Sequence, residues 1–598
     1  MGGQRQGTWL DGVDELVSRV QDGDSIAVSG FHFVRVPMAQ LRALVARSPR
    51  DLSYVSWGGG LPLEVLLAAG AVSKITFCFS SLDVFGLAPR FRRALESGAV
   101  EVEEWTALAF TKGLEAAHEG MGFEVLQQPA GSDVFPGKVS PTPGPGGTGG
   151  PPLVAVPAIG VDVLLLHAQR ADDAGNVEIS GARGLDTGTI FAAKRVLVSV
   201  EERVPDGALG APRSYVLPRT FVTALALAPG GARPASCLPF YGTDYRALHE
   251  FTQLGLDEPI VPWLNSTTAP RTPPVLSLIA QRRVERPDVV SAYRPPRGTP
   301  AQPPTSYTVD ELMVCLLARE VTNESVCSVG SVSPLATAAY LLAKRTSAPG
   351  ASILSYNGGY LDVAFRPICL LAAEALDYAS CVAFAGGDDT YHDYYQRGLV
   401  THEIVQVAQI DRLGATNNIR VTRSGGGFVR LPGQGGMADV ANLHANFTLY
   451  VTRHSPRSLV ERVETVSAAR AWHGAERRRY GLAAGSVALL TNLGQFRYDE
   501  EKAELVLTHL HPGVTIDEVA AQTGFELRVA PEVTESVPPT AEELEMLRQE
   551  VDPFGVRRLE FVPSAERDAL IRELLSKEEA ALEQISVASS LAGSGGER

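Results

Sequence analysis

The sequence is poor in features that several broad classes of protein depend on. Its 598 residues include only 6 cysteines, which form no Cys-x-x-Cys pair and have no histidine at zinc-ligand spacing. We therefore expect reduced, buried thiols in a cytoplasmic protein and no metal site, with a cysteine nucleophile as the less favoured alternative. No uninterrupted apolar run is long enough to span a membrane, and the first residues lack the apolar core of a signal peptide.

Positive charge is also scarce. The 53 lysines and arginines are outnumbered by 68 aspartates and glutamates, which gives a net charge of -15. A nucleic-acid or anionic-membrane partner requires a basic face, so we expect neither. An anionic substrate would have to meet a local positive site.

What the sequence does contain is an alternation of strand-like and helix-like segments, in a chain too long for a single core. Residues 25–30 form a short apolar segment that ends in Gly30, and a helix-like segment opens at Pro37. A second such unit runs through residues 52–55 into three successive glycines, Gly58, Gly59 and Gly60. Strands alternating with helices predict an α/β fold with a mainly parallel sheet covered by helices.

The chain divides into two similar halves. A proline-rich stretch at residues 294–304 precedes a helix-start signal at Thr308, so we place a first domain at 1–290, a linker at 291–307 and a second domain at 308–590. Segment 323–330 resembles segment 23–30. Segments 408–417 and 168–176 share Ala-Gln, Asp, Gly and Asn in the same order. Two similar halves predict a pseudo-symmetric pair with a cleft between them.

One stretch of the second half is typical of a site. Ser355-Tyr356-Asn357-Gly358-Gly359 follows the mostly apolar residues 351–354. Turn-forming residues after a short buried strand would place the Tyr356 side chain at the carboxyl end of that strand, where open α/β sheets carry their chemistry. Taken alone, the stretch is more often a simple turn.

Many of these segments resemble the class I coenzyme A transferases, in particular the glutaconate branch. Near Arg35, in residues 168–176 and in residues 192–202, the first half resembles the α-type chain of that family. The second half resembles the β-type chain in residues 409–417 and in Gly433-Gln434-Gly435-Gly436. The resemblance covers most of the chain. It implies two CoA-transferase-like domains, α-subunit-like and β-subunit-like, fused in one chain.

The same resemblance singles out Tyr356. In classical members a glutamate of the β-type half carries CoA as a glutamyl thioester, and Tyr356 stands where that glutamate belongs. A phenol cannot form such a thioester, so CoA transfer is not expected to proceed at this position. Two branches of the family, a hydrolase and a decarboxylase, work without that glutamate and cleave a carbon–carbon bond. In the hydrolase branch the working glutamate aligns with Glu104, or with Glu103 if the register slips by one; a solvated acidic strand is the alternative.

The resemblance therefore implies an enzyme that cleaves a carbon–carbon bond in a dicarboxylic or β-keto acyl-CoA. Its substrate is a coenzyme A thioester, and we expect no permanently bound cofactor; whether the chain forms a homo-oligomer is left open. Two alternatives remain: a classical CoA transferase that uses another carboxylate, and a non-catalytic acyl-CoA binding protein. The expected catalytic residues are Tyr356 and Glu104. The expected substrate-binding residues are Arg35, which would hold a carboxylate, Gly30, Gly58, Gly59, Gly60, Asn357 and Gly358. The expected CoA-binding residues are Gly433, Gly435, Gly436 and Asn417.

Overall fold

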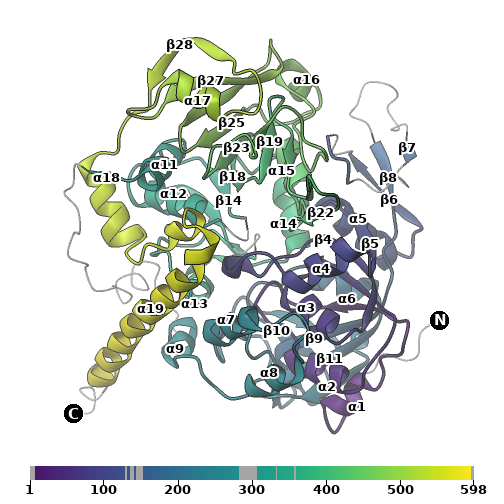
Figure 1. The fold of residues 1–598 in the computed structure, drawn as a ribbon. Helices are drawn as coiled ribbons and strands as arrows, with labels where there is room; N and C mark the ends of the chain where they lie inside the picture. The colour runs from purple at the N-terminus through teal and green to yellow at the C-terminus, as the bar shows by residue number, and fades with distance from the viewer. Residues whose placement is uncertain are drawn as a thin grey trace.

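The computed structural model describes residues 7–127, 131–134, 140–142, 153–281, 306–330, 333–355 and 359–593. In Figure 1 the elements of the first half, purple to teal, form the lower part of the molecule, and most elements of the second half, green to yellow, form the upper part. The α/β class predicted from the sequence is confirmed in both halves. The predicted linker lies largely outside the described residues, so the domain boundaries stay predictions.

The first half is built on a mainly parallel sheet with the strand order β1-β13-β11-β9-β2-β3-β4-β5. Every neighbouring pair along this order is parallel. Antiparallel β10 lies beside β9, β12 pairs with β10, and β6, β8 and β7 form a small separate sheet. The strands are β1 (Thr8–Trp9), β2 (Ser25–Val28), β3 (Leu52–Gly58), β4 (Val72–Phe79), β5 (Glu101–Glu104), β6 (Phe123–Gln127), β7 (Ser140–Thr142), β8 (Leu153–Pro157), β9 (Val161–Asp172), β10 (Val177–Ile179), β11 (Ala193–Val204), β12 (Tyr215–Leu217) and β13 (Ala224–Leu227).

Helices follow the strands of the first half in the alternation that the sequence predicts. Helix α5 begins where the hydroxyl of Thr106 accepts a hydrogen bond from the Ala109 N–H, which is a standard N-cap. The helical elements are α1 (Val13–Val17), α2 (Met38–Ala46), α3 (Gly60–Ala68), η1 (Asp83–Phe85), α4 (Pro89–Ser97), α5 (Ala107–His118), α6 (Asp186–Ala192), η2 (Arg219–Phe221), α7 (Tyr245–Gln253), α8 (Val261–Ser266) and α9 (Val275–Gln281).

The second half has a mixed sheet in the order β15-β14-β18-β23-β25-β26-β27-β28. Its first five strands are parallel, and β26 and β27 pair antiparallel. Smaller sheets hold the remaining strands. The strands are β14 (Val326–Ser328), β15 (Ser352–Leu354), β16 (Tyr360–Leu361), β17 (Ala383–Phe384), β18 (His402–Gln406), β19 (Gln409–Asp411), β20 (Thr416–Asn417), β21 (Arg420–Thr422), β22 (Phe428–Arg430), β23 (Asn446–Val451), β24 (Leu459–Val460), β25 (Val487–Thr491), β26 (Gly494–Asp499), β27 (Glu504–Leu510) and β28 (Val529–Glu535).

The predicted helix-start signal of the second half is confirmed. Thr308 and Glu311 form a reciprocal capping box at the start of α11. The helical elements are α11 (Val309–Ala318), α12 (Pro334–Arg345), α13 (Ala373–Ser380), α14 (Gly387–Thr390), η3 (Tyr391–Tyr395, a π-helix), α15 (Met437–Leu443), α16 (Gly474–Arg479), α17 (Ile516–Gln522), α18 (Ala541–Met546), η4 (Leu547–Val551), η5 (Val556–Glu560) and α19 (Ser564–Gly593).

The two halves repeat one turn, as the sequence suggests. After β9, the Gly175 N–H donates to the Asp172 carbonyl at 3.0 Å and the Asp172 N–H donates to the Asn176 carbonyl. After β19, the Gly414 N–H donates to the Asp411 carbonyl at 3.0 Å, and the Asp411 N–H donates to the carbonyl of the residue after Gly414. Both glycines have a positive φ, which the turn requires and glycine adopts without strain. The repeat therefore extends to backbone hydrogen bonds.

The halves share their hydrophobic interior. One cluster of buried side chains contains Trp57 and Trp105 of the first half together with Met437 and Phe447 of the second. Helix α19 also returns to the first half, where Arg567 donates to the Val84 carbonyl at 2.9 Å. In Figure 1 this yellow helix descends past α13 of the second half and α9 of the first.

Candidate active site

Parallel strands of both halves direct their carboxyl ends toward a common junction. In the first half, β2, β3 and β4 end in the segments that contain His32, Gly58 and Asp83. In the second half, β14 and β15 end just before Gly330 and at Ser355. Side chains or backbone of all five positions line cavities, described below, at this junction. Ligand sites of open α/β sheets lie at such ends.

The glycine-rich loop of the second half, Gly433-Gln434-Gly435-Gly436, completes one edge of this junction. The Gly435 N–H donates to the Cys78 carbonyl at 3.1 Å, and the Ser80 N–H donates to the Pro432 carbonyl at 2.7 Å. A Cβ built on Gly433 would lie 2.7 Å from the Cys78 carbonyl oxygen, and Gly433 has a φ of 109°. Only glycine fits at this position. The loop predicted to bind CoA thus contacts the ends of β4 and β5.

Glu104 lies under this loop. Its Oε2 forms an ion pair with Arg430 at 2.8 Å, and both side chains are largely buried. Its other oxygen, Oε1, is buried and has no hydrogen-bond partner among the described residues, and neither have the Nε and Nη2 atoms of Arg430. A buried polar atom without a partner is uncommon and often marks a place where a ligand or water binds. Oε1 would be 2.9 Å from a Cβ built on Gly433.

The neighbouring glutamate has a different environment. Glu103 projects to the other face of β5, where it contacts Lys74 at 3.4 Å, and it is more exposed than Glu104. Successive residues of a strand point to opposite faces, so only one of the two can face the other half. The geometry therefore favours Glu104 over Glu103 as the carboxylate at the junction.

A cavity of about 100 Å³ lies between the halves, and we call it the inter-half cavity. From the first half it is lined by His32, Asp83 and Tyr245, and from the second by Ser355 and Arg366, among others. Ser355 and Tyr360 pair through both backbone hydrogen bonds, at 3.0 and 3.1 Å. The predicted site residues Tyr356, Asn357 and Gly358 fall between them and lie outside the described residues.

A second, smaller cavity adjoins the first at His32. It is lined by Gly30, by Gly58, Gly59 and Gly60, and by Phe79. The structure thus brings together four glycines that the sequence predicts for the substrate site. Phe79 also packs near Gly433, whose built Cβ would lie 3.1 Å from the Phe79 Cα. Glu104 lines neither cavity; Phe79 and Gly433 connect it to them.

Two polar residues of these cavities, His32 and Asp83, were not predicted from the sequence. His32 and Asp83 both have a positive φ, 52° and 53°, which is strained for residues other than glycine and is concentrated at functional sites. Burial lowers the pKa of His32 to about 3, so its imidazole is neutral, and burial raises the pKa of Asp83 to about 7. Their places, just after β2 and β4, were the available signal in the sequence.

Arg35 does not fit the role predicted for it. Its side chain is fully buried and its Nη2 lies 2.6 Å from Asp186 Oδ2 and 2.8 Å from the Ala182 carbonyl. Its Nη1 donates to the His167 carbonyl at 3.2 Å. Asp186 thus occupies the place beside the guanidinium that we expected a substrate carboxylate to take.

Asn417 is engaged in its own turn. Its amide donates to Gln409 Oε1 at 2.9 Å and to the Arg420 carbonyl at 2.6 Å, and its side-chain oxygen accepts from the Ile419 N–H. The side chain is completely buried. Its contacts hold β19 and the β20–β21 turn together, and its predicted contact with CoA stays a prediction.

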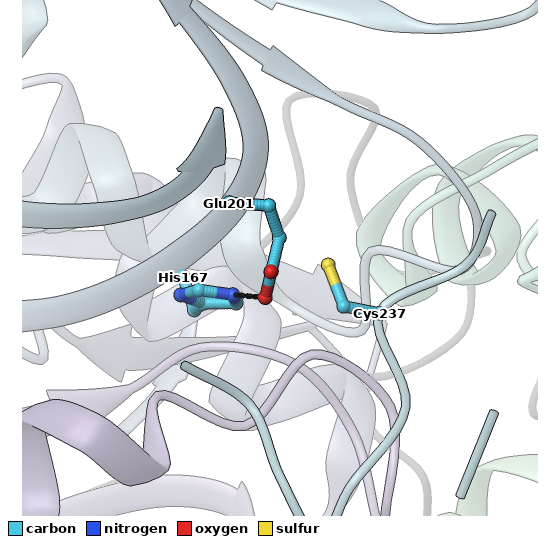
Figure 2. Close-up of side chains that lie close together, drawn as sticks. All are labelled: His167, Glu201 and Cys237. Carbon is cyan, nitrogen blue, oxygen red and sulfur yellow. Dashed lines mark hydrogen bonds and ion pairs between the residues drawn. The ribbon is translucent and has the colours of Figure 1, made fainter. Parts of the chain in front are cut away.

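Three potential metal ligands, His167, Glu201 and Cys237, lie close together in the first half (Figure 2). Glu201 accepts from the His167 imidazole at 2.7 Å, from the Gly230 N–H at 2.6 Å and from the Tyr241 hydroxyl. Burial raises the pKa of the Cys237 thiol well above its usual range, which disfavours the thiolate that a metal needs. The carboxylate is the centre of a hydrogen-bond network that connects β9 and β11 to the segment before α7.

A family model described as coenzyme A transferase matches residues 11–228 and 311–522, one stretch in each half. The chain belongs to the coenzyme A transferase family. Both subunits of a 3-oxoadipate CoA-transferase from Pseudomonas knackmussii are relatives, and each matches about two fifths of this chain. The first is 34% identical over 263 residues, which make up 42% of this chain and 90% of that protein. The second is 31% identical over 248 residues, which make up 41% of this chain and 93% of that protein. The predicted fusion of two subunit types is confirmed.

This coenzyme A transferase family member also has relatives with other activities. A cholesterol ring-cleaving hydrolase IpdA subunit from Mycobacterium tuberculosis is 32% identical over 274 residues, 43% of this chain and 93% of that protein. Among solved structures, the acyl-CoA transferase YdiF from Escherichia coli O157:H7 superposes with a TM-score of 0.64 over 90% of this chain and 98% of that chain, at 15% identity. This likeness concerns the fold.

No helix in the described ranges has the length and apolar character to cross a bilayer.

Proposed function

We propose that the protein cleaves a carbon–carbon bond in the acyl part of an acyl-CoA, by hydrolysis or decarboxylation, and does not carry the CoA on a glutamate. The observation that carries the proposal is the Glu104 carboxylate, which is buried at the junction of the halves and has one oxygen, Oε1, without a partner in the described ranges. The similarity to a ring-cleaving hydrolase supports it. So does the predicted match of Tyr356 to the position of the family glutamate.

In the hydrolytic version, Glu104 Oε1 takes a proton from a water molecule while the water oxygen attacks a carbonyl carbon of the acyl group. The bond between that carbon and the carbon next to the thioester then breaks, and its electron pair becomes a thioester enolate. The Tyr356 hydroxyl donates a hydrogen bond to the enolate oxygen, and the proton held by Glu104 returns to the enolate carbon. In the decarboxylative version the terminal carboxylate of a glutaconyl-type acyl group leaves as carbon dioxide, the electron pair of the broken bond forms a dienolate conjugated with the thioester, and this dienolate takes a proton from water on carbon.

The geometry places a requirement on this mechanism. Because Glu104 lines neither cavity and lies close to Gly433, the reacting carbon must reach the Gly433 side of Phe79. Oε1 is buried, and a Cβ at Gly433 would lie 2.9 Å from it, so the missing side chain leaves room beside this oxygen. Arg430 holds the opposite oxygen and so fixes the direction of Oε1.

The test is an incubation of the full chain with a β-keto acyl-CoA and with a glutaconyl-type acyl-CoA, each with and without acetate, followed by mass spectrometry. We expect a shortened acyl-CoA to form at the same rate whether or not acetate is present. Formation of acetyl-CoA and free acid only when acetate is present would instead show CoA transfer.

Classical CoA transfer is the second candidate, because both subunits of a 3-oxoadipate CoA-transferase are relatives. Because residue 356 is a tyrosine, transfer would need a carboxylate at another position. Asp83, which lines the inter-half cavity, is a candidate. A glutamyl- or aspartyl-CoA thioester is cleaved by hydroxylamine and reduced by borohydride. We expect the protein, pre-incubated with acyl-CoA, to retain its activity after either treatment. Inactivation with a mass change on one carboxylate would support transfer and identify the nucleophile.

A further inference from the structure

The inter-half cavity has a lining that discriminates between acyl groups. Much of its wall is apolar, with Val84 from the first half and Val329, Ile368 and Leu370 from the second. Its polar lining includes uncharged hydroxyl side chains, among them that of Ser355. What matters for an anionic substrate is the charge of the groups around this wall.

The cations near the cavity are already engaged by protein groups. Arg366 lines the wall, and its Nε and Nη2 contact the two oxygens of Asp377 at 2.6 and 2.9 Å. Arg567 donates to the carbonyls of Val84 and Leu559, at 2.9 and 2.6 Å. Arg35, expected to hold a carboxylate, pairs with Asp186.

Among the described residues, the other titratable groups at the cavity are carboxyl groups, a neutral imidazole, the Tyr245 phenol and the Cys369 thiol. Asp83 lines the inter-half cavity and, with Glu374, an adjoining small pocket. Burial raises the pKa values of both carboxyl groups to about 7, and burial keeps His32 uncharged by lowering its pKa. A substrate carboxylate would therefore lie near the carboxyl groups of Asp83 and Glu374, and ionisation of several carboxyl groups in one place is unfavourable.

We propose that this cavity receives the acyl group of the CoA thioester and selects acyl groups that carry no charge, namely hydrocarbon chains with at most neutral keto or hydroxyl oxygens. The inference rests on the proposed action on acyl-CoA and specifies its substrate class. It excludes acyl groups that end in a carboxylate, and with them the decarboxylative version of the proposed function, so it selects the hydrolytic version. A buried carboxylate needs a cation or several hydrogen-bond donors, whereas the arginine of the lining, Arg366, is already paired with Asp377 and the lining also contains the carboxyl group of Asp83.

The test compares matched pairs of CoA thioesters by isothermal titration calorimetry with the full-length protein. Hexanoyl-CoA is paired with adipoyl-CoA, and 3-oxohexanoyl-CoA with 3-oxoadipoyl-CoA, so that each pair differs only in a terminal carboxylate. We expect the uncharged member of each pair to bind at least tenfold more tightly. Equal binding, or tighter binding of the carboxylate member, would overturn the inference.

Two variants test the cause of the preference. Asp83→Asn removes an acid without changing its size, and Thr337→Lys introduces a cation on the cavity wall. We expect Asp83→Asn to bring the affinities for the uncharged and the carboxylate member of each pair closer together. We expect Thr337→Lys to make the carboxylate member the tighter ligand. Asp257→Asn, at an almost fully exposed carboxylate of the same half, is the control and should leave the ratio unchanged. Unchanged ratios in both cavity variants would contradict the assignment of the cavity.

The outcomes separate this inference from the proposed function. If wild-type protein binds no CoA thioester of either kind, the action on acyl-CoA is wrong. If it binds both kinds equally, the action on acyl-CoA stands and the selectivity is wrong. The wild-type comparison is decisive even if a variant fails to fold.

Discussion

Glu104 of the first half and Arg430 of the second form a buried ion pair at 2.8 Å, and this pair lies where the glycine-rich loop of the second half crosses the ends of β4 and β5. The guanidinium also lies over the rings of Phe77 and Phe91, at 5.5 and 5.6 Å from their centroids. The carboxylate is therefore fixed by groups from both halves. Its position depends on their correct association.

Glu104→Gln should reduce the turnover of a β-keto acyl-CoA by roughly two to four orders of magnitude, because an amide cannot accept the proton from water. Glu103→Gln is the matched control, since it removes the adjacent carboxylate from the other face of β5. We expect the control to keep nearly full activity. Steady-state kinetics of both variants measure the effect, and equal losses would contradict a chemical role for Glu104.

Tyr356→Phe should keep the fold and lower the turnover number by roughly two to three orders of magnitude, the usual effect of removing one donor to an oxyanion. Tyr356→Glu introduces the glutamate that the resemblance to classical family members predicts at this position, and it should gain acyl-CoA:acetate CoA transfer that hydroxylamine inhibits. Tyr480→Phe, which removes a partly exposed hydroxyl of the same half, is the control. Full activity of Tyr356→Phe would rule out the hydrogen-bond role.

Gly433→Ala should both destabilise the protein and abolish activity. The new methyl group would lie 2.7 Å from the Cys78 carbonyl and 2.9 Å from Glu104 Oε1, and a φ of 109° is strained for alanine. Strain of this kind costs about 1–3 kcal/mol before any steric clash. Gly425→Ala is the control, because no atom of the described chain lies within 4 Å of its built Cβ. Thermal unfolding should show a lower midpoint for Gly433→Ala alone.

Asp439 should make stability depend on pH. This second-half carboxylate accepts from the Leu108 N–H at 2.9 Å in helix α5, and burial raises its pKa to about 7. Between the ordinary value near 4 and about 7, the folded chain binds the proton more tightly than the unfolded chain. Its contribution is therefore full below about pH 4 and is lost as pH rises to 7, by about 1.4 kcal/mol per pH unit.

Asp439→Asn tests this sign. The amide resembles the protonated acid, so variant and wild type should have similar thermal midpoints near pH 4, and the variant should become increasingly the more stable of the two as pH rises to 7.5. Asp517→Asn, at an exposed position, should show no such pH-dependent difference. A variant that loses stability relative to wild type as pH rises would show that the charged form of Asp439 is the stabilising one.

The sequence predicted the fold well because its signals are local. Strand-like residues 351–354 correspond to β15, and the Thr308 capping box starts α11. The site was harder to predict, since each side chain depends on a partner far along the chain. Nothing in the sequence indicates that Asp186 neutralises Arg35, or that Arg430 holds Glu104.

The cavity residues missed by the sequence illustrate the same limit. His32 and Asp83 adopt left-handed backbone conformations that cannot be predicted from their residue types, because the surrounding structure imposes them. The glycines were more informative. Gly30 and Gly433 were predicted from the sequence as site residues, and in the structure a side chain at either would clash with backbone atoms. The role of Tyr356 stays a prediction, because that residue lies outside the described part of the chain.

The covalent joining of the two halves has a consequence for the composition of the junction. Separate proteins associate in proportion to their concentrations, whereas tethered partners meet at an effective concentration that reaches the millimolar range for short flexible connections. An intramolecular junction can therefore form even when its contact surface is not optimised for affinity. This allows it to contain the oxygen of Glu104 and the nitrogens of Arg430 that no described residue pairs, polar atoms that would weaken the association of two free proteins.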